Sequence, residues 1–292
     1  MANIFGMNMK VSSSGGSIDF YDDPVVLLTD ISGMGLDAEV VTTERACHNG
    51  SWYRYTRVPE RTITIQATYK PLSFNEVVNK RKQIHDILQP GEKLDILYNG
   101  GWAIMSLDGY AEKCEDTENG NLMVCSITII CPDPFFKGES QVELINGETT
   151  INYSGTVPTG VVLEVDNAEK VNFTINNETL FVDSNLITPA PKTIISNIPQ
   201  TMPVNASAAS TLLNTASDKP EDIILDTSKI TISTLRNKKS VLYGDSEINR
   251  LSTIKNNSLY PELTPGVNHI TITDGSKPIS GTLRYTPLYG GV

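Results

Sequence analysis

Few residues of this chain have the types and spacing that catalysis requires. A serine stands beside a carboxylate in the run 244–246 (Gly-Asp-Ser), as in the nucleophile block of some esterases, but the run comes late and a turn is favoured. The three histidines fall in a hairpin turn, on a helix flank and before a strand, at His48, His85 and His269. None has an Asp or Ser at a spacing that suggests a triad. We therefore expect no catalytic residues and no enzyme activity, although paired carboxylates are recognised only by their separation in space.

Metal and cofactor sites are equally unsupported. The four cysteines form no C-x-x-C pair and have no histidine at metal-ligand spacing: Cys47, Cys114, Cys125 and Cys131. The chain also lacks a glycine-rich phosphate loop, a dinucleotide fingerprint and a calcium loop. We expect no metal and no cofactor.

Two of the cysteines could nevertheless meet. Asn119-Gly120 is typical of a two-residue type I′ turn, and with that turn Cys114 lies opposite Cys125. Cα atoms of a hydrogen-bonded cross-strand pair are about 5.5 Å apart, which a disulfide can span. A reducing compartment favours two packed thiols instead.

Aromatic residues gather near the tip of a predicted long hairpin. Its strands, 36–45 and 52–57, flank the turn signal Asn49-Gly50. Trp52, Tyr53 and Tyr55 could form a protein interface, pack in a core, or stack on a sugar ring, in that order of preference. We predict that these three residues and Arg45 form a subunit interface.

The elements around this hairpin predict an antiparallel sheet with one helix. Alternating residues indicate a half-buried strand over 61–69, and further strands are predicted over 25–29, 93–98, 103–113 and 122–131. Ser73 and Glu76 have capping-box spacing, and apolar residues recur at helical intervals as far as Leu88. This apolar stripe, with Phe74, Val77, Val78, Ile84 and Ile87, is expected to pack on the sheet.

A second β-domain is predicted beyond the proline-rich run 131–136. Proline lacks the ladder donor, so the sheet must end there, and we place the domains at 1–137 and 138–292. Short strands separated by turn residues then indicate a β-sandwich: 142–144, 161–165, 171–175, 179–182, 223–225, 230–234, 269–273 and 281–285. The segment 183–220, rich in proline and small residues, is either a functional surface excursion or a tolerated insertion.

Composition limits the partners. A formal net charge of −11 and a pI near 4.8 argue against specific nucleic-acid binding, because such surfaces need clustered Lys and Arg. The acidity suits either solubility or the wall of a channel through which DNA passes. No apolar run is long enough to cross a bilayer, and the first 20 residues do not resemble a signal peptide, so we expect no membrane insertion and a cytoplasm-like compartment.

Several short runs follow one another in a characteristic order: 58–65, 84–91 and 131–136 (Cys-Pro-Asp-Pro-Phe-Phe), then 260–268 (Tyr-Pro-Glu-Leu-Thr-Pro-Gly-Val-Asn) and the closing residues 285–292. In this order, over almost the whole chain, they carry a resemblance to the distal tail proteins of siphoviruses. It implies a mainly β fold, with a tail-tube-like sheet domain carrying one α-helix and a galectin-like C-terminal β-sandwich. The segment 183–220 departs from the family pattern.

The resemblance also implies a structural role in a virion. A homo-hexameric ring at the tail tip, assembled in a bacterial host cytoplasm, would join the tail tube protein to tail-tip or adhesion proteins, would let DNA pass, and could meet the tape-measure protein. The alternative is a non-catalytic carbohydrate-binding module for host-wall glycans, which the sandwich-like second half suggests. A phage, a prophage or a tail-derived particle could be the source.

Overall fold

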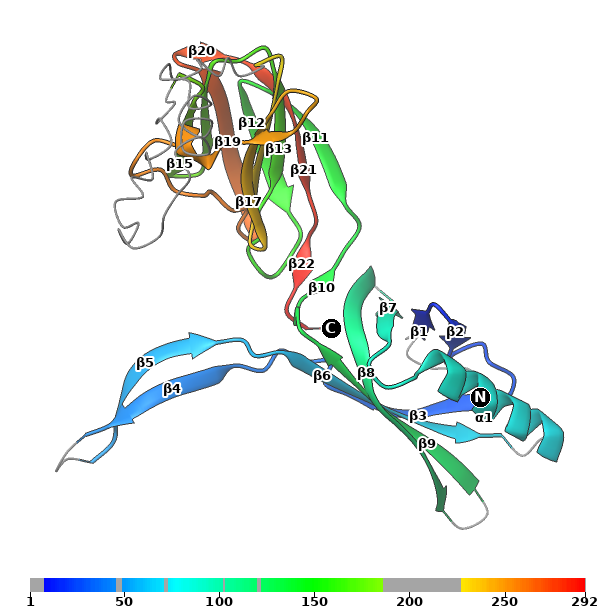
Figure 1. The fold of residues 1–292 in the computed structure, drawn as a ribbon. Coiled ribbons are helices and arrows are strands. Elements are labelled where there is room, and N and C mark those ends of the chain that lie inside the picture. Colours follow the sequence, from blue (N-terminus) through cyan, green and yellow to red (C-terminus); the bar gives the residue numbers. More distant parts are fainter. Residues whose placement is uncertain are drawn as a thin grey trace, which may run out of the picture.

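The computed structural model describes residues 8–45, 49–70, 73–101, 103–119, 122–185 and 227–291. In this part of the chain there is one α-helix, and the strands form sheets of nine, six, five and two members. The larger sheets enclose two separate hydrophobic cores. The predicted mainly β fold with a single α-helix is confirmed (Figure 1).

The first half of the chain, together with one short strand over residues 288–289, forms the nine-stranded sheet. Its main path runs β2-β1-β7-β8-β9-β6-β3, all antiparallel, with β10 and β22 attached beside it. The bounds are β1 Asn8–Ser13, β2 Gly16–Asp19, β3 Val26–Ser32, β6 Arg61–Tyr69, β7 Lys93–Asn99, β8 Ile104–Asn119, β9 Leu122–Cys131, β10 Phe136–Lys137 and β22 Leu288–Tyr289. Strands β6 and β9 have their predicted limits, whereas β1 and β2 were not predicted.

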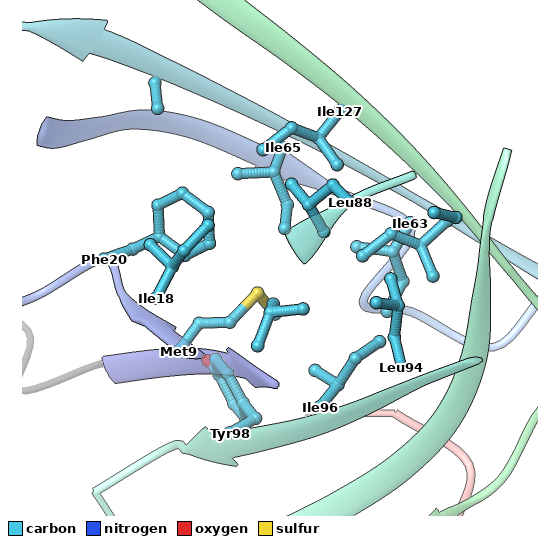
Figure 2. Close-up of a cluster of buried hydrophobic side chains, with 14 of the residues drawn as sticks. Met9, Ile18, Phe20, Ile63, Ile65, Leu88, Leu94, Ile96, Tyr98 and Ile127 are labelled. Atoms are coloured by element: carbon cyan, nitrogen blue, oxygen red, sulfur yellow. The ribbon is translucent and has the colours of Figure 1, made fainter. Parts of the chain in front are cut away.

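The core of this half lies inside the curl of the sheet. On β6 the odd-numbered residues are buried, because successive side chains of a strand alternate between its faces. Figure 2 shows Ile63 and Ile65 of β6 on one side of the core, with Met9 and Ile96 from β1 and β7 on the other. The predicted half-buried strand is therefore confirmed.

Helix α1, Phe74–Ile87, covers one end of this core. Ser73 caps it through the predicted capping box with Glu76. Ile84, Ile87 and Leu88 are buried, but Phe74 is 81% exposed and Val78 is also exposed. The predicted apolar stripe was wrong at its N-terminal end, because the buried residues of the helix belong to its last turns.

The second half of the chain is a β-sandwich. One sheet has the order β11-β21-β13-β16-β17-β18, and the other runs β12-β19-β14-β15 with β20 beside β19. The bounds are β11 Gln141–Asn146, β12 Glu148–Tyr153, β13 Val162–Asp166, β14 Lys170–Ile175, β15 Glu178–Asp183, β16 Lys229–Leu235, β17 Lys238–Tyr243, β18 Ile248–Asn249, β19 Gly266–Asp274, β20 Lys277–Pro278 and β21 Ser280–Tyr285, with a short 3-10 helix, η1, at Leu251–Thr253. Strands β12 and β17 were not predicted.

Two predictions fall largely outside the described residues. Most of the excursion over 183–220 and the strand over 223–225 lie there. The division at residues 137 and 138 stays a prediction, and so do the tail-tube and galectin likenesses. Residues 132–140 and 286–291 are the two places where the described chain passes between the cores.

The predicted register of the β8–β9 hairpin was wrong by two residues. Asn119 pairs with Leu122, so Cys114 lies opposite Ile127 and Cys125 lies opposite Asp116. The two cysteines are diagonal neighbours, and their sulfur atoms are 3.7 Å apart as free thiols. The Asn-Gly signal therefore predicted the hairpin but not the register of its strands.

Candidate functional site

A two-stranded ribbon extends from the nine-stranded sheet, and we call it the arm. It consists of β4, Glu39–Glu44, and β5, Ser51–Arg57, with the residues that join them. Among the described residues these strands pair only with each other, and Figure 1 shows them running out from the ends of β3 and β6. Every residue of β5 is exposed.

The predicted interface residues lie on this arm. Trp52, Tyr53 and Tyr55 are 62%, 64% and 53% exposed, and Arg45 is exposed beside them. The alternative that these aromatic residues pack in a core is wrong. Their role as a subunit interface stays a prediction, which the isolated chain does not test.

A β-bulge decides which aromatic residues share a face. Val41 lies opposite Tyr55, but Thr42 lies opposite Tyr53, so the register shifts at Arg54. The shift places Trp52 on the same face as Tyr55 and leaves Tyr53 on the other face. A hydrogen bond from the Tyr53 hydroxyl to Thr56 Oγ1 agrees with this assignment.

The face that carries Trp52 and Tyr55 is also cationic. The Arg45 guanidinium lies 5.1 Å from the centre of the Trp52 ring, and Arg54 Nε donates to Thr43 Oγ1 at 2.8 Å. Arg57 forms an ion pair with Glu39 at 2.7 Å, which raises the pKa of Arg57 through the hydrogen bond and the charge. Aromatic residues and arginine are the types enriched where proteins bind each other.

The base of the arm is held by a buried arginine. Arg61 is 5% exposed, and its guanidinium donates to four backbone carbonyls: Gly33, Gly35 and Pro134 at 2.7 Å, and Gly290 at 2.5 Å. The guanidinium carbon of Arg61 also lies 4.7 Å from the centre of the Phe136 ring. Burial lowers the pKa of Arg61, with Cys131 and Asp37 opposing the change, and an arginine stays protonated throughout the physiological range.

Gly33 lets the chain pass close to the backbone of β6 beside Arg61. Its φ is +83°, which favours glycine, and a Cβ there would lie 1.9 Å from the carbonyl oxygen of Thr62. No other residue type fits without moving the backbone. The turn into the arm is therefore fixed at Gly33.

Our sequence interpretation did not identify Arg61 as functional, although a signal was present. Arg61 stands in the odd-numbered register of β6, whose other members are buried and apolar. A charge in a buried register needs polar partners. That rule would have singled out Arg61, but its backbone partners come from distant segments that the rule does not identify.

The residues considered for catalysis do not assemble into a site in the described part of the chain. Ser246 lies in an exposed turn, as favoured. His85 Nε2 bonds to Asp116 and His269 Nδ1 to Thr150, while His48 lies outside the described residues. The described ranges contain no group of three or more potential metal ligands, and none of their helices has the length and apolar character to cross a bilayer.

Comparison with known proteins identifies the fold. No protein-family model matches the sequence, and no curated protein matches it. The crystal structure of the Dit protein of phage SPP1, described as a paradigm of the hub of the adsorption apparatus in phages that infect Gram-positive bacteria, superimposes with a TM-score of 0.63 and 12% identity. This match covers 96% of this chain and 98% of the Dit chain.

Two structures of the phage p2 baseplate in its activated conformation, with Ca and with Sr, are more distant. Their TM-scores are 0.44 and 0.41, at 10% and 11% identity. The matches cover 98% and 96% of this chain and 99% and 98% of theirs. Of these three structures, that of Dit is similar enough to define the fold, and the protein has that fold along almost its whole length.

Proposed function

We propose that this protein, which has the Dit fold, is a structural hub of a phage tail tip and not an enzyme. Its copies close into a ring, which we expect to be a hexamer, in the tail tip of a virion or a tail-derived particle. The ring joins the tail tube protein to baseplate or adhesion proteins and lets DNA pass. The fold over nearly the whole chain supports the hub role, and the exposed arm supports self-assembly.

The arm is the observation that carries this proposal. A two-stranded ribbon is marginally stable alone in water, and contiguous exposed apolar surface marks an interaction site. A closed ring needs head-to-tail contacts between two different surfaces of each copy. An arm that projects from one end of the sheet supplies one of these surfaces (Figure 1).

The test is the mass of the purified protein across a concentration range. We expect light scattering to give a species near six times the 31.9 kDa chain mass, and negative stain to show a ring with a central hole. A monomer at every concentration, and also after addition of a tail tube protein, would count against ring assembly.

Glycan binding is a second candidate, and a groove in the sandwich favours it. The groove encloses about 380 Å³ between the β14–β15 turn and the segment before β19. Asn176, Glu178, Tyr260 and Glu262 line it with hydrogen-bonding groups and one aromatic ring. A pocket of this size with a few polar groups can hold a small ligand.

A glycan array with the intact protein decides this candidate. Binding that Glu262→Gln abolishes would support a saccharide site in the groove, while an array without signal would exclude it. Glu143→Gln is the matched control, because Glu143 lies on β11 and does not line the groove.

A further inference from the structure

The Arg61 side chain contacts both the root of the arm and the segments that connect the two cores. Gly33 and Gly35 lead from β3 into the arm, and Arg61 itself begins β6 directly after the arm returns. Pro134 lies on the segment that leads to the sandwich, and Gly290 lies on the segment that comes back from it. Both roots of the arm and both crossings between the cores therefore meet at one guanidinium.

The four hydrogen-bond acceptors of Arg61 are all on the backbone. All four bonds go to backbone carbonyls, and the ion pairs found among the described residues do not include Arg61. A carboxylate side chain can follow an arginine by changing rotamer, whereas a carbonyl can move only with its backbone. The planar fork of arginine thus fixes three backbone segments relative to one another.

The C-terminal segment is anchored to the sandwich on its other side. Gly290 N donates to Thr156 Oγ1 at 2.9 Å, and Leu288 N donates to the Tyr153 hydroxyl at 2.8 Å. Leu288 O accepts from the backbone N–H groups of Thr156 and Val157. Residues 288–290 are therefore held by the sandwich and by Arg61 together.

The same segment touches the root of the arm directly. A Cβ built on Gly290 would lie 2.8 Å from Leu36 Cδ2, so the side chain of Leu36 packs against this glycine. Leu36 lies between Gly35 and β4. The C-terminal segment thus contacts the arm root through a side chain as well as through Arg61.

We propose that Arg61 is a positioning residue: it fixes the direction of the arm relative to the sandwich, with residues 288–290 as the link. The use of the arm in ring assembly rests on the proposed function, but the direction of the arm is a property of one chain. A displacement of the sandwich would be transmitted to the arm through this link. The arm and the sandwich thus move as one body.

The test measures the distance from the arm to the sandwich within one chain. Tyr53 and Phe181, which are both exposed, are each replaced by an amino acid with a keto group that carries a spin label. Pulsed electron paramagnetic resonance then measures the distance between the two labels. Labelled chains are diluted into excess unlabelled protein, so that only distances within one chain contribute. This readout does not require that a ring forms.

Arg61→Met is the informative variant, and Arg57→Met is its matched control. The methionine side chain retains most of the apolar stem of Arg61 without any donor, whereas Arg57 makes an exposed ion pair with Glu39 within the arm. We expect a narrow distribution of the distance between the labels in the parent and in Arg57→Met. In Arg61→Met the distribution should be at least about two-fold broader, because the arm can then rotate about its root.

A merely structural role for Arg61 gives a different result. In that case Arg61→Met would lower the midpoint of thermal unfolding but leave the distribution narrow well below that midpoint, and the proposal would be overturned. If Arg61→Met does not fold, Arg61→Lys keeps the charge without the planar fork and should broaden the distribution. A narrow distribution in Arg61→Lys would then overturn the proposal.

The outcomes also separate this inference from the proposed function. A monomeric parent with a narrow distribution that broadens in Arg61→Met would refute ring assembly and support the positioning role. A parent whose distribution is already as broad as that of Arg61→Met would refute the positioning role, whatever its mass.

Discussion

Trp52 is the residue on which arm-mediated assembly should depend most. It is the largest exposed side chain of the arm, and Arg45 covers its ring. We expect Trp52→Ala to weaken assembly by about 2 kcal/mol or more, because large aromatic residues dominate interfaces. The measurement is the concentration at which light scattering shows dissociation, with Phe181→Ala on the sandwich as the control. Unchanged assembly would remove Trp52 from the interface.

Asp116 is the residue through which acid should weaken the fold. Its carboxylate accepts from Arg81, His85 and Tyr69, which outweigh the effect of burial and hold its pKa below the ordinary 3.8. A depressed pKa adds stability that is present above 3.8 and is lost as the pH falls through the lower folded-state value.

Asp116→Asn should therefore unfold more easily at neutral pH, by about 1–3 kcal/mol, because three donors lose an ionised partner. In urea titrations the difference from the parent should shrink as the pH falls below 3.8. Asp95→Asn is the control, since Asp95 is exposed on β7. A difference that stays constant with pH would mean that the charge of Asp116 is not responsible.

The two faces of the arm carry different aromatic side chains. Simple alternation would place Tyr53 with Tyr55, but the bulge at Arg54 places Trp52 with Tyr55. In double-mutant cycles on assembly, Trp52→Ala and Tyr55→Ala should couple by about 0.5 kcal/mol or more, while Tyr53→Ala and Tyr55→Ala should be nearly additive. The reverse pattern would mean that the bulge is absent in the assembled protein.

The β8–β9 hairpin brings two thiols together. Their hydrogen bond raises the pKa of Cys125 and lowers that of Cys114, and the sulfur atoms are 3.7 Å apart. A small-molecule disulfide should therefore oxidise Cys114 and Cys125 in the folded protein to a disulfide bond between them. The reagent takes up the two electrons and is released as two thiols. Peptide mass mapping identifies the bond. Burial raises the pKa of Cys131 to about 12, so a link through Cys131 would contradict the prediction.

Patterns within a single element were predictable, and contacts between distant elements were less so. The alternation of β6 and the capping box of α1 predicted those elements with nearly their observed bounds, because both signals are local. The register of β8 was wrong because a turn signal fixes residues only to within a position or two. The acceptors of Arg61 come from segments up to 229 residues away, which no local pattern can identify.

At the scale of the whole molecule, the arm is separate from both cores. Neither hydrophobic cluster includes a residue of β4 or β5, and the roots of the arm are fixed by Arg61 and Gly33. The sheet and the sandwich should therefore fold without the arm, and the arm should serve assembly alone. Replacing residues 39–57 with an Asn-Gly turn tests this separation. Glu39 and Arg57 are the first cross-strand pair of the arm, and the new hairpin turn joins the residues next to them, Ala38 and Val58.

We expect the shortened chain to be a folded monomer. Its midpoint of thermal unfolding should differ from that of the parent chain, measured as a monomer at low concentration, by less than about 2 °C, since a loss of 1 kcal/mol already shifts the midpoint by roughly 2–4 °C in chains of this size. Circular dichroism checks the fold, and light scattering checks the mass. A chain that still forms rings would show that other surfaces suffice for assembly, and a chain that fails to fold would make the arm part of the folding unit.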